Sequence, residues 1–368
     1  MEIPGSSIKV RKHPYPAADC CGGMRKTILR KKTMNNKKIV FEAPWKVSYH
    51  SEEIQLCPGK GEMLVETLYS LISTGTELAC LSGGESWFQM PAVPGYCCVS
   101  KVLEAGEDAP YKEGDLIFHY GMHSRYQLTS PDSYNLVVKV PEGLDLQSIP
   151  MVRMATIAFT SIRVSEIELG DVVLVSGLGL VGNMAAQLAH LSGAVVIGVD
   201  PAPSRRELAE KVGIDCAVSP EEAEAAVQRL TEGRGCNTVI EATGIPACAK
   251  TCLSYVGYHG EMILLGTPRG DYETNLAEVL RCTHLDELGC VTLKGAHEWR
   301  IPTMRERYVK HSIERNTMVC FDQIRRGKLH LKELVSHVLT PEEAADVYLK
   351  LNEDRNAYLG IIIDWSKA

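Results

Sequence analysis

A short glycine-rich loop near the middle of the chain has the residue pattern of a phosphate-binding turn. It directly follows the apolar run VVLVS and precedes a helical stretch, the context that a G-x-G-x-x-G pattern requires. The first glycine permits a tight turn, the second lets the backbone approach a pyrophosphate, and the third lets helix and strand pack closely. The pyrophosphate would lie at the helix N-terminus, where free N–H groups favour anions. The loop consists of Gly177, Leu178, Gly179, Leu180, Val181 and Gly182.

An acidic residue follows this loop at a distance typical of a ribose ligand. Asp200 ends the next apolar run, VVIGVD, 18 residues beyond Gly182. Its carboxylate can accept hydrogen bonds from the ribose hydroxyls of an adenosine, and it would repel the 2′-phosphate of NADP. Arg205 and Arg206 lie close by and could instead hold that phosphate, and Asp200 could merely cap a turn. Together, the loop and Asp200 predict a dinucleotide site that prefers NAD to NADP.

The elements around the loop alternate between strands and helices. In residues 158–296, the strand-like runs VVLVSG, VVIGVD, NTVIEATG, EMILLGTP and GCVTLKGA are separated by helical stretches, one of which we expect to reach Gly257. Such alternation predicts an α/β fold with a doubly wound parallel Rossmann sheet. Residues 38–150 are instead β-rich, with the runs MLVETLYSLI, YCCVSKVLEA and DLIFHY. Residues 297–368 hold two helical stretches and a final strand, YLGIIIDW.

Composition limits the classes of function that the chain can have. The 368 residues carry a formal net charge of −7 and contain no apolar run long enough to span a membrane, which argues against nucleic acid and membranes as partners. The 13 cysteines form no C-x-x-C pair, and we expect reduced thiols in a cytoplasmic protein. Residues 1–37 mix Pro, Gly and Ser with a basic stretch and predict a disordered tail, the alternative being an anchor for an anionic surface.

Further motifs occur in an order known from one enzyme superfamily. They are Gly114-Asp115, Val140-Pro141, Thr156, Glu241-Ala242-Thr243-Gly244, Leu265-Gly266-Thr267-Pro268 and Lys294-Gly295-Ala296. With them the chain resembles the medium-chain dehydrogenase/reductase superfamily, which includes zinc alcohol, sorbitol and threonine dehydrogenases. The resemblance implies a GroES-like β-rich catalytic domain in residues 38–157 and 297–368. It also implies a Rossmann domain that binds NAD in residues 158–296, and a homodimer formed through the strand around Val291–Gly295.

The same resemblance places more residues beside the cofactor than the glycine loop and Asp200 alone. A threonine lies near the nicotinamide, and the ends of two further strands frame the cofactor. These residues are Thr156, Thr243, Gly244, Leu265, Gly266 and Thr267.

The residues at the superfamily's zinc-binding positions depart from its pattern. Thr74 stands where the family has a cysteine, and Tyr96 and Cys97 stand where it has a histidine and a glutamate. The remaining ligand position falls near Val152, which cannot bind a metal. The segment that binds a structural zinc through four cysteines reads FHYGMHSRYQL here and has no cysteine. Since zinc requires several Cys, His or carboxylate ligands, we expect no metal.

Without zinc, hydrogen-bond donors of the protein must hold the substrate oxygen. The resemblance places four candidate catalytic residues at the pocket, and each has a plainer interpretation. Thr76 matches a hydroxyl that relays a proton in the family, or it is only a hydroxyl in a turn. Tyr96 projects into the vacated metal site, where it is a hydrogen-bond donor to the substrate or only fills the space. Glu77 matches a family aspartate and is either a catalytic residue or structural support. His119, which precedes Tyr120, lines the substrate cleft or is only a packing residue.

Three more residues could take part, but the sequence does not place them. His297 follows the last predicted strand of the Rossmann domain, where the family uses backbone contacts, and Arg125 or Arg153 could bind a substrate anion. We therefore predict a zinc-independent NAD(H)-dependent oxidoreductase that transfers a hydride between nicotinamide and a secondary alcohol or ketone, such as a polyol or sugar. The alternatives are an NAD(P)H-dependent enone or quinone reductase and a non-catalytic nucleotide-binding relative. No motif specifies the small-molecule substrate.

Overall fold

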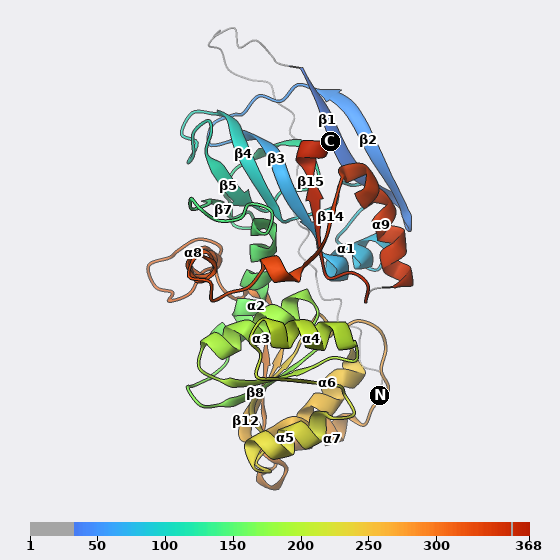
Figure 1. Cartoon of the computed structure of the whole chain (residues 1–368), viewed down its shortest axis with the longest axis vertical. Helices are drawn as coiled ribbons and strands as arrows, with labels where there is room; N and C mark the ends of the chain where they lie inside the picture. The colour runs from blue at the N-terminus through green and yellow to red at the C-terminus, as the bar shows by residue number, and fades with distance from the viewer. Residues whose placement is uncertain (1–32, 355) are drawn as a thin grey trace, which may run out of the picture.

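The computed structural model describes residues 33–354 and 356–368. Two lobes meet at a waist: a β-rich lobe that contains both the first and the last described strands, and a parallel-sheet lobe built from the middle of the chain (Figure 1). Most of the predicted tail, residues 1–32, lies outside the described residues. Its end, residues 34–37, begins strand β1, so the predicted tail extends too far. In the described part of the chain, no helix has the length and apolar character to cross a membrane.

Six strands form the sheet of the parallel-sheet lobe, and all of them run parallel. The spatial order is β10-β9-β8-β11-β12-β13, so the direction of winding reverses between β8 and β11. In open parallel sheets this reversal opens a crevice at the carboxyl ends of the strands, where ligands bind. The strands are β8 (Val172–Ser176), β9 (Val195–Val199), β10 (Cys216–Val218), β11 (Cys236–Glu241), β12 (Val256–Leu264) and β13 (Thr292–Gly295).

Helices cover both faces of this sheet, which explains why its strands are apolar on both sides (Figure 1). One face packs against α3 (Leu180–Leu191) and α4 (Pro203–Lys211), and the other packs against α5 (Ala223–Thr231) and α6 (Pro246–Cys252). A further helix, α7 (Leu276–His284), has no buried residue.

The β-rich lobe contains a hairpin and a larger, mostly antiparallel sheet. The larger sheet has the order β14-β15-β3-β4-β5-β7, with β6 paired to β3. The strands are β1 (Met34–Ala43), β2 (Lys46–Ile54), β3 (Met63–Ile72), β4 (Cys98–Ala105), β5 (Leu116–His119), β6 (Tyr126–Thr129), β7 (Val137–Lys139), β14 (Val335–Leu339) and β15 (Gly360–Asp364). The helices outside the parallel-sheet lobe are α1 (Thr74–Leu81), α2 (Val152–Val164), α8 (Ile313–Arg325) and α9 (Pro341–Glu353).

Short 3₁₀ helices complete the chain, and one core joins the lobes. Helix α2 supplies buried residues such as Ala155 and Ala158 to a cluster that also includes Phe118 of the β-rich lobe and Val173 of the parallel-sheet lobe. The 3₁₀ helices are η1 (Ile149–Met151), η2 (Leu253–Tyr255), η3 (Asp286–Leu288), η4 (Glu298–Arg300), η5 (Lys332–Leu334) and η6 (Trp365–Lys367).

The predicted fold class, a Rossmann-like parallel sheet joined to a β-rich domain, is confirmed. The helical stretch expected to reach Gly257 is wrong at its end, because α6 stops at Cys252 and β12 already begins at Val256. The sequence interpretation also missed the β1–β2 hairpin, α1, α5, α7, β10 and β14. Several of these elements are short or have few buried residues, so their apolar periodicity is weak.

Candidate functional site

The glycine loop after β8 forms a cradle at the crevice between β8 and β11. Gly177 has a φ of +92°, which favours glycine. A Cβ on Gly182 would lie 1.8 Å from the Gly177 carbonyl oxygen, so the third glycine is required for the helix to pack on the loop. A Cβ on Gly179, which precedes α3, would meet nothing within 4 Å. That open space at a helix N-terminus fits a pyrophosphate.

A buried carboxylate organises the facing wall of the cradle. Glu241 ends β11 and accepts hydrogen bonds from the backbone N–H of Thr243 at 2.7 Å, from that of Gly244 at 3.2 Å, and from the Thr243 hydroxyl. Its carbonyl oxygen accepts from Leu265 N at 2.9 Å and from Gly266 N at 2.8 Å. The sequence motif that contains Glu241 does not indicate a role for this residue. In the structure, Glu241 holds the ends of β11 and β12 together.

Close backbone contacts bring the predicted cofactor-binding residues into one place. A Cβ on Gly177 would lie 2.8 Å from Thr243 Cγ2, and a Cβ on Gly244 would lie 2.4 Å from the Thr267 carbonyl oxygen. A Cβ on Gly266 would lie 2.3 Å from Gly244 N. Leu178 points into the core, whereas Leu180 and Val181 are half-buried in the first turn of α3.

Asp200 lies where the sequence predicts it, directly after β9. Its two carboxylate oxygens accept hydrogen bonds from Leu178 N at 2.8 Å and from Ala202 N at 2.9 Å. The Arg205 guanidinium lies 3.5 Å from the carboxylate, and Arg206 donates to the Asp200 carbonyl oxygen at 2.7 Å. The carboxylate is therefore tied to the glycine loop. Oδ1 keeps a lone pair for a ribose hydroxyl, whereas Oδ2 already accepts from Leu178 N and from Arg205.

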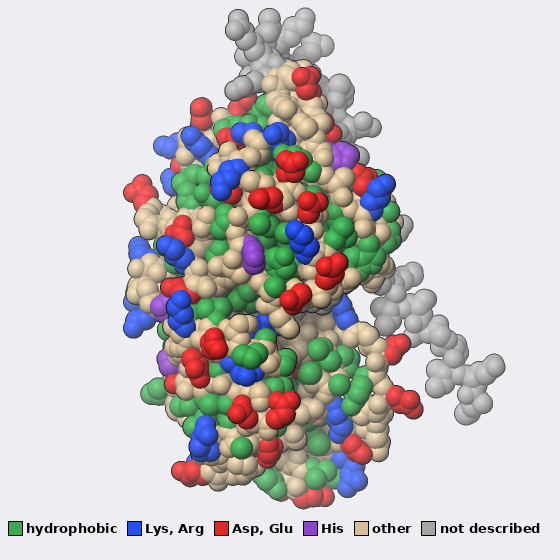
Figure 2. Space-filling view, turned by 45° about the vertical axis from the view of Figure 1, so that its right-hand side comes forward, with side chains coloured by type: hydrophobic (Ala, Val, Ile, Leu, Met, Phe, Trp, Pro, Cys, Tyr) green, Lys and Arg blue, Asp and Glu red, His purple; other side chains and the backbone are tan. Residues whose placement is uncertain are grey.

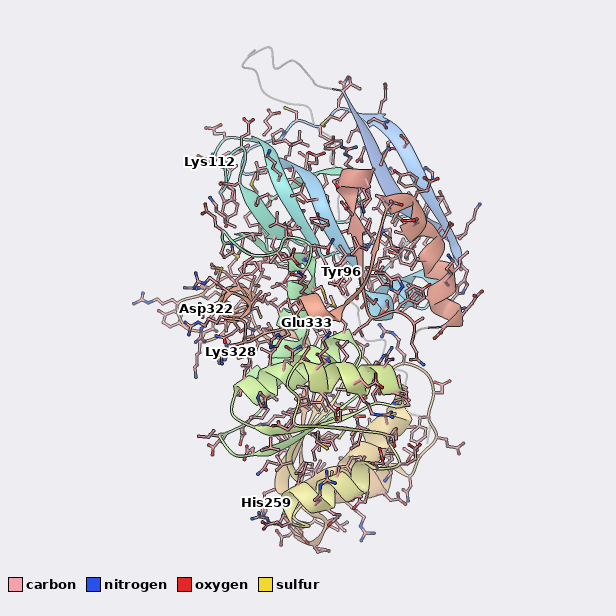
Figure 3. All side chains as sticks on the ribbon, viewed as in Figure 1. Tyr96, Lys112, His259, Asp322, Lys328 and Glu333 are labelled. Carbon is pink, nitrogen blue, oxygen red and sulfur yellow. The ribbon has the colours of Figure 1, made fainter. Side chains whose placement is uncertain are left out.

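Three hydroxyls meet where the β-rich lobe faces the parallel-sheet lobe, and Figure 3 shows Tyr96 at this edge. The Tyr96 hydroxyl donates to Ser73 Oγ at 2.5 Å, and the Thr76 hydroxyl also lies close enough to interact with it. Burial raises the pKa of Tyr96 far above its usual range, although Ser73, Thr76 and the cation of Arg153 oppose that rise. Tyr96 thus remains a neutral O–H donor at neutral pH.

A buried arginine lies beside this group of hydroxyls. Arg153, at the start of α2, is 3% exposed and forms a two-pronged ion pair with Glu298 of η4. Its guanidinium carbon is 3.9 Å from the ring centroid of Tyr120, 5.3 Å from that of Tyr96 and 5.8 Å from that of Trp299. The arrangement places a fixed cation among aromatic faces, next to Tyr96.

The inner end of this cluster contains Thr156 of α2. The Thr156 hydroxyl donates to the Arg153 carbonyl oxygen at 2.9 Å and also lies beside the Tyr120 hydroxyl, whose pKa is raised by burial and lowered in part by Arg153. Neither the Tyr120 hydroxyl nor Arg153 Nε has a partner within hydrogen-bond distance among the described residues. Thr156 therefore lies at the junction of the lobes, and its place beside the nicotinamide stays a prediction.

Glu77 belongs to a structural network behind the hydroxyls rather than to the pocket. Its buried carboxylate accepts hydrogen bonds from Ser73 N at 2.8 Å, from the Tyr348 hydroxyl at 2.5 Å and from His123 Nε2 at 3.1 Å. Trp365 Nε1 donates to Ser70 Oγ at 2.9 Å, which leaves the Ser70 hydroxyl to donate to His123 Nδ1. Of the two interpretations of Glu77, this geometry favours the structural one, in which the carboxylate stabilises the start of α1.

His119 lies inside the β-rich lobe, so its prediction as a catalytic residue is not supported. Its side chain is fully buried, and Nε2 shares a 2.7 Å hydrogen bond with Ser100 Oγ on β4. Burial lowers the pKa of His119 to about 3, so the ring stays neutral and cannot deliver a proton at neutral pH. A Cβ on Gly121 would lie 2.4 Å from the ring, which shows how tightly it is packed.

The other two residues considered from the sequence also lie away from the hydroxyls. Arg125 pairs with Glu66 at 3.1 Å and donates to the carbonyl oxygen of Ala368. His297 is exposed and precedes η4. The sequence interpretation missed Ser73, Glu298 and Glu241, and it named Arg153 without placing it. The Glu77 carboxylate accepts from Ser73 N, but the spacing of four residues is one longer than that of a capping box, so no local motif indicated Ser73.

The residues at the superfamily's zinc positions do not fit a metal site. Val152 is apolar and fully buried, and Thr74 and Tyr96 supply only hydroxyls. The Cys97 thiol is fully buried and is a single potential ligand, whereas zinc requires several. Within residues 33–354 and 356–368, no three His, Cys, Asp or Glu side chains lie close enough together to hold a metal ion.

Known proteins resemble this chain in sequence. Residues 181–306 match the family described as zinc-binding dehydrogenase. The D-guloside 3-dehydrogenase of Shigella flexneri is 26% identical over 261 residues, which cover 70% of this chain and 72% of that protein. A sorbitol dehydrogenase of Halalkalibacterium halodurans is 30% identical over 150 residues, which cover 40% of this chain and 43% of that protein.

Solved structures share the fold at lower identity. The galactitol-1-phosphate dehydrogenase of Escherichia coli has a TM-score of 0.75 at 17% identity, covering 89% of this chain and 99% of that one. A dehydrogenase from Sinorhizobium meliloti 1021 bound to NADP has a TM-score of 0.73 at 20% identity, and one from Escherichia coli CFT073 complexed with NADH has a TM-score of 0.73 at 18% identity. Each of these two comparisons covers 90% of this chain and 99% of the matched chain.

A parallel sheet with a glycine cradle, joined to a β-rich lobe, defines a nucleotide-dependent oxidoreductase. In sequence and in fold, the chain is similar to members of the medium-chain dehydrogenase/reductase superfamily. Its relatives include sugar and polyol dehydrogenases, so an oxidoreductase that acts on alcohols with a nicotinamide cofactor is supported.

Proposed function

We propose that this chain is a zinc-independent NAD(H)-dependent dehydrogenase that interconverts a secondary alcohol and a ketone of a polyol or sugar. The observation that carries the proposal is the group of three hydroxyls, Ser73, Thr76 and Tyr96, at the superfamily's metal-binding position. The sugar and polyol class rests on the D-guloside and sorbitol dehydrogenases among the relatives.

The protein's own groups would handle the proton and the developing charge. When bound, the nicotinamide would accept or supply the hydride. In the reducing direction, Tyr96 would donate its proton to the substrate oxygen, and its bond to Ser73 Oγ gives a route for replacing that proton. In the oxidising direction the same relay would run in reverse: Tyr96 would accept the alcohol proton while it passes its own proton to Ser73 Oγ, and the Ser73 hydroxyl would release its proton towards solvent. The Arg153 cation, 5.3 Å from the Tyr96 ring, favours the negatively charged intermediate of either direction.

The cradle supports NAD(H) as the cofactor of the proposal. Gly177, Gly179 and Gly182 would hold the pyrophosphate, and Asp200 would accept the ribose hydroxyls. The Asp200 carboxylate would also repel the 2′-phosphate of NADP, although Arg205 reduces that repulsion.

Zinc independence is part of the proposal and has its own measurement. The matched zinc-binding dehydrogenase segment begins at residue 181, so it includes none of Thr74, Tyr96, Cys97 and Val152. We expect elemental analysis of protein purified without a metal-affinity tag to find far less than one zinc per chain. Activity that is lost to a chelator and restored by zinc would refute this part.

The test of the whole proposal is Tyr96→Phe, which keeps the ring and removes only the hydroxyl. A panel of polyols and sugars, followed through NADH absorbance, first identifies a substrate. We then expect the turnover number to fall at least about tenfold, since one preorganised donor is worth roughly 10²–10³ in rate. The affinity for NADH, measured by fluorescence, should not change.

The matched control is Tyr111→Phe, which removes a partly buried hydroxyl far from the cradle that donates to the Val137 carbonyl oxygen. This variant should keep native turnover. If Tyr96→Phe also turns over at the native rate, Tyr96 only fills space, and Thr76→Val becomes the variant that tests the remaining hydroxyl. A native protein that oxidises no member of the panel would contradict the proposal itself.

We also propose that the protein is a cytoplasmic homodimer. Strand β13 is one edge of the parallel sheet, β10 being the other, and apolar side chains on β13 and on helix α7 are exposed. Leu276 and Leu280 of α7 are 62% and 56% exposed, and Leu293 of β13 is 40% exposed. An apolar sheet edge is an association surface. Light scattering should find a dimer at micromolar concentration, and Leu280→Glu should give a monomer; a native monomer would refute the dimer.

A further inference from the structure

Four basic side chains gather between the end of α2 and the start of α8, away from the cradle and the hydroxyls. Arg163 lies in the last turn of α2, Lys310 and His311 directly precede α8, and Arg315 lies in its first turn. On the face shown in Figure 2, by contrast, acidic and basic side chains are mixed. The pairing of α2 with α8, visible in Figure 1, brings this cluster together from segments far apart in sequence.

The hydrogen bonds of this cluster all go to neutral groups. Arg163 Nε donates to Asn316 Oδ1 at 3.0 Å, and Arg315 Nη1 donates to the Lys310 carbonyl oxygen at 2.8 Å and to His311 Nδ1 at 2.9 Å. The Arg163 guanidinium also lies 4.1 Å above a phenylalanine ring. Because His311 accepts from Arg315, it is held in its neutral form.

No carboxylate of the described residues neutralises the cluster. Glu314, the nearest acid in sequence, has its carboxylate directed to Arg305 instead. Burial lowers the pKa of His311, and the positive charges of Arg163, Arg315 and Lys310 lower that pKa further. Burial and the charge of Arg315 lower the pKa of Arg163 as well. The cations therefore repel one another, an arrangement that costs free energy unless an anion lies among them.

A buried amide provides an independent indication of a ligand. Asn316 is fully buried, and its Oδ1 already accepts from Arg163. Its Nδ2 has no hydrogen-bond partner in the described part of the chain. A buried N–H donor without a partner costs about 1–3 kcal/mol in general, so such a group calls for an acceptor. An anion beside Arg163 would satisfy both the amide and the guanidinium.

We propose that Arg163, Arg315 and the amide of Asn316 form a binding site for a phosphate-class oxyanion. Guanidinium groups bind phosphate through paired, charge-assisted hydrogen bonds, and the near-double charge of phosphate matches two arginines. The occupant is inorganic phosphate or the phosphate group of a small phosphomonoester. The site is distinct from the group of hydroxyls around Tyr96, because it lies at the opposite end of α2 from Arg153 and Thr156.

The experiment measures phosphate binding to the native chain and to two variants. Inorganic phosphate and glycerol 3-phosphate are each titrated by calorimetry, and the melting temperature is recorded against sodium chloride of equal ionic strength. We expect a rise of at least about 3 °C at saturating phosphate. Arg163→Gln and Arg315→Gln should each weaken binding at least tenfold, since each removes a charged donor. The tighter of the two ligands identifies the source of the phosphate group.

A second measurement separates a ligand site from a structural role. In phosphate-free buffer, Arg163→Gln should melt at or above the native temperature, because it removes a like-charge repulsion. Arg307→Gln is the matched control: it lies on the loop before α8, stacks on Tyr308, and should bind phosphate as the native chain does. The proposal is overturned if neither anion stabilises the protein beyond chloride, or if both variants bind as tightly as the native chain. These readouts do not depend on dehydrogenase activity.

Discussion

The two halves of the candidate site are built in different ways. The half that belongs to the parallel-sheet lobe is made of backbone: glycines whose missing side chains allow close approach, and N–H groups held by Glu241 and Asp200. The half that belongs to the β-rich lobe is made of side chains from α1 and its N-cap, α2, η4 and the segments that precede β4 and follow β5. Tyr96 reaches Ser73, and Arg153 reaches Glu298 across 145 positions of sequence.

This difference explains why one half keeps the superfamily's pattern and the other departs from it. A backbone cradle tolerates no added atoms, since a Cβ on Gly182 would lie 1.8 Å from a carbonyl oxygen. A side-chain cluster can exchange its members as long as volume and charge are kept. Around Tyr96, a cation and several hydroxyls lie beside the positions where the resemblance implies zinc ligands. The nucleotide half is thus constrained by geometry, and the substrate half by electrostatics.

The largest expected effect tests the backbone half. Gly179→Ala should leave the free energy of unfolding unchanged, because the new Cβ meets nothing within 4 Å. It should nevertheless weaken NADH binding by about 100-fold, because the methyl group would occupy the space for the pyrophosphate. Calorimetry and chemical denaturation measure the two quantities. Gly182→Ala is the contrasting variant and should lose stability as well as binding; native NADH affinity in Gly179→Ala would refute the cradle.

The next effect tests the support behind the hydroxyls. The Glu77 carboxylate accepts three hydrogen bonds. In Glu77→Gln, the amide NH₂ group would face the donors of Tyr348 and His123, so at least one of these hydrogen bonds is lost. We expect the free energy of unfolding to fall by about 2–3 kcal/mol. Urea denaturation measures it, with Glu52→Gln, which removes an exposed pair with Lys38, as the control that should change little. Equal stability of the two variants would show that the network contributes nothing.

The same difference determines how much the sequence could predict. The cradle is local: Gly177 to Gly182 are contiguous, and Asp200 follows one helix and one strand later, so residue order alone indicates the geometry. The parallel sheet was predictable for a related reason, since its buried strands are continuous apolar runs. Strand β14 was missed, because its residues are only partly buried and do not alternate clearly.

The substrate half could be predicted only through resemblance, and then only in part. The family's motif indicates positions for Tyr96 and Thr76, and the structure brings the two hydroxyls together, while their roles in catalysis stay predictions. His119 was misplaced, because the strand that carries it has two faces, and nothing local indicates that its ring lies between Ser100 and Gly121. Arg153 could not be placed, since its partner Glu298 comes from a segment after the whole parallel sheet.

A smaller effect is the contribution of His119 to the pH dependence of stability. Its pKa is about 6.5 in an unfolded chain and about 3 when folded, so below pH 6.5 the unfolded chain binds a proton that the folded chain does not. Stability is therefore greatest above pH 6.5 and falls as pH decreases toward 3. Between pH 7.5 and 5 this group should remove about 2 kcal/mol.

His119→Gln should lose this part of the pH dependence, while the exposed His284→Gln should retain it. Urea denaturation at the two pH values measures the difference between the variants. The turnover number of His119→Gln, per folded molecule, should equal that of the native chain, because the ring is enclosed in the β-rich lobe. A tenfold loss of turnover would restore His119 as a catalytic residue.

The smallest expected effect concerns the choice of cofactor. Asp200 presents a carboxylate to the ribose, so NADH should bind at least about tenfold more tightly than NADPH, which corresponds to about 1.4 kcal/mol. The effect is modest because Arg205 lies 3.5 Å from the carboxylate and reduces its repulsion of a 2′-phosphate. Asp200→Asn keeps an acceptor for Leu178 N but removes the charge, so the preference should shrink toward equality. Asp171→Asn, far from the cradle at the start of β8, should keep the native ratio. Native protein that binds NADPH as tightly as NADH would show that Arg205 and Arg206, rather than Asp200, decide what the cradle accepts.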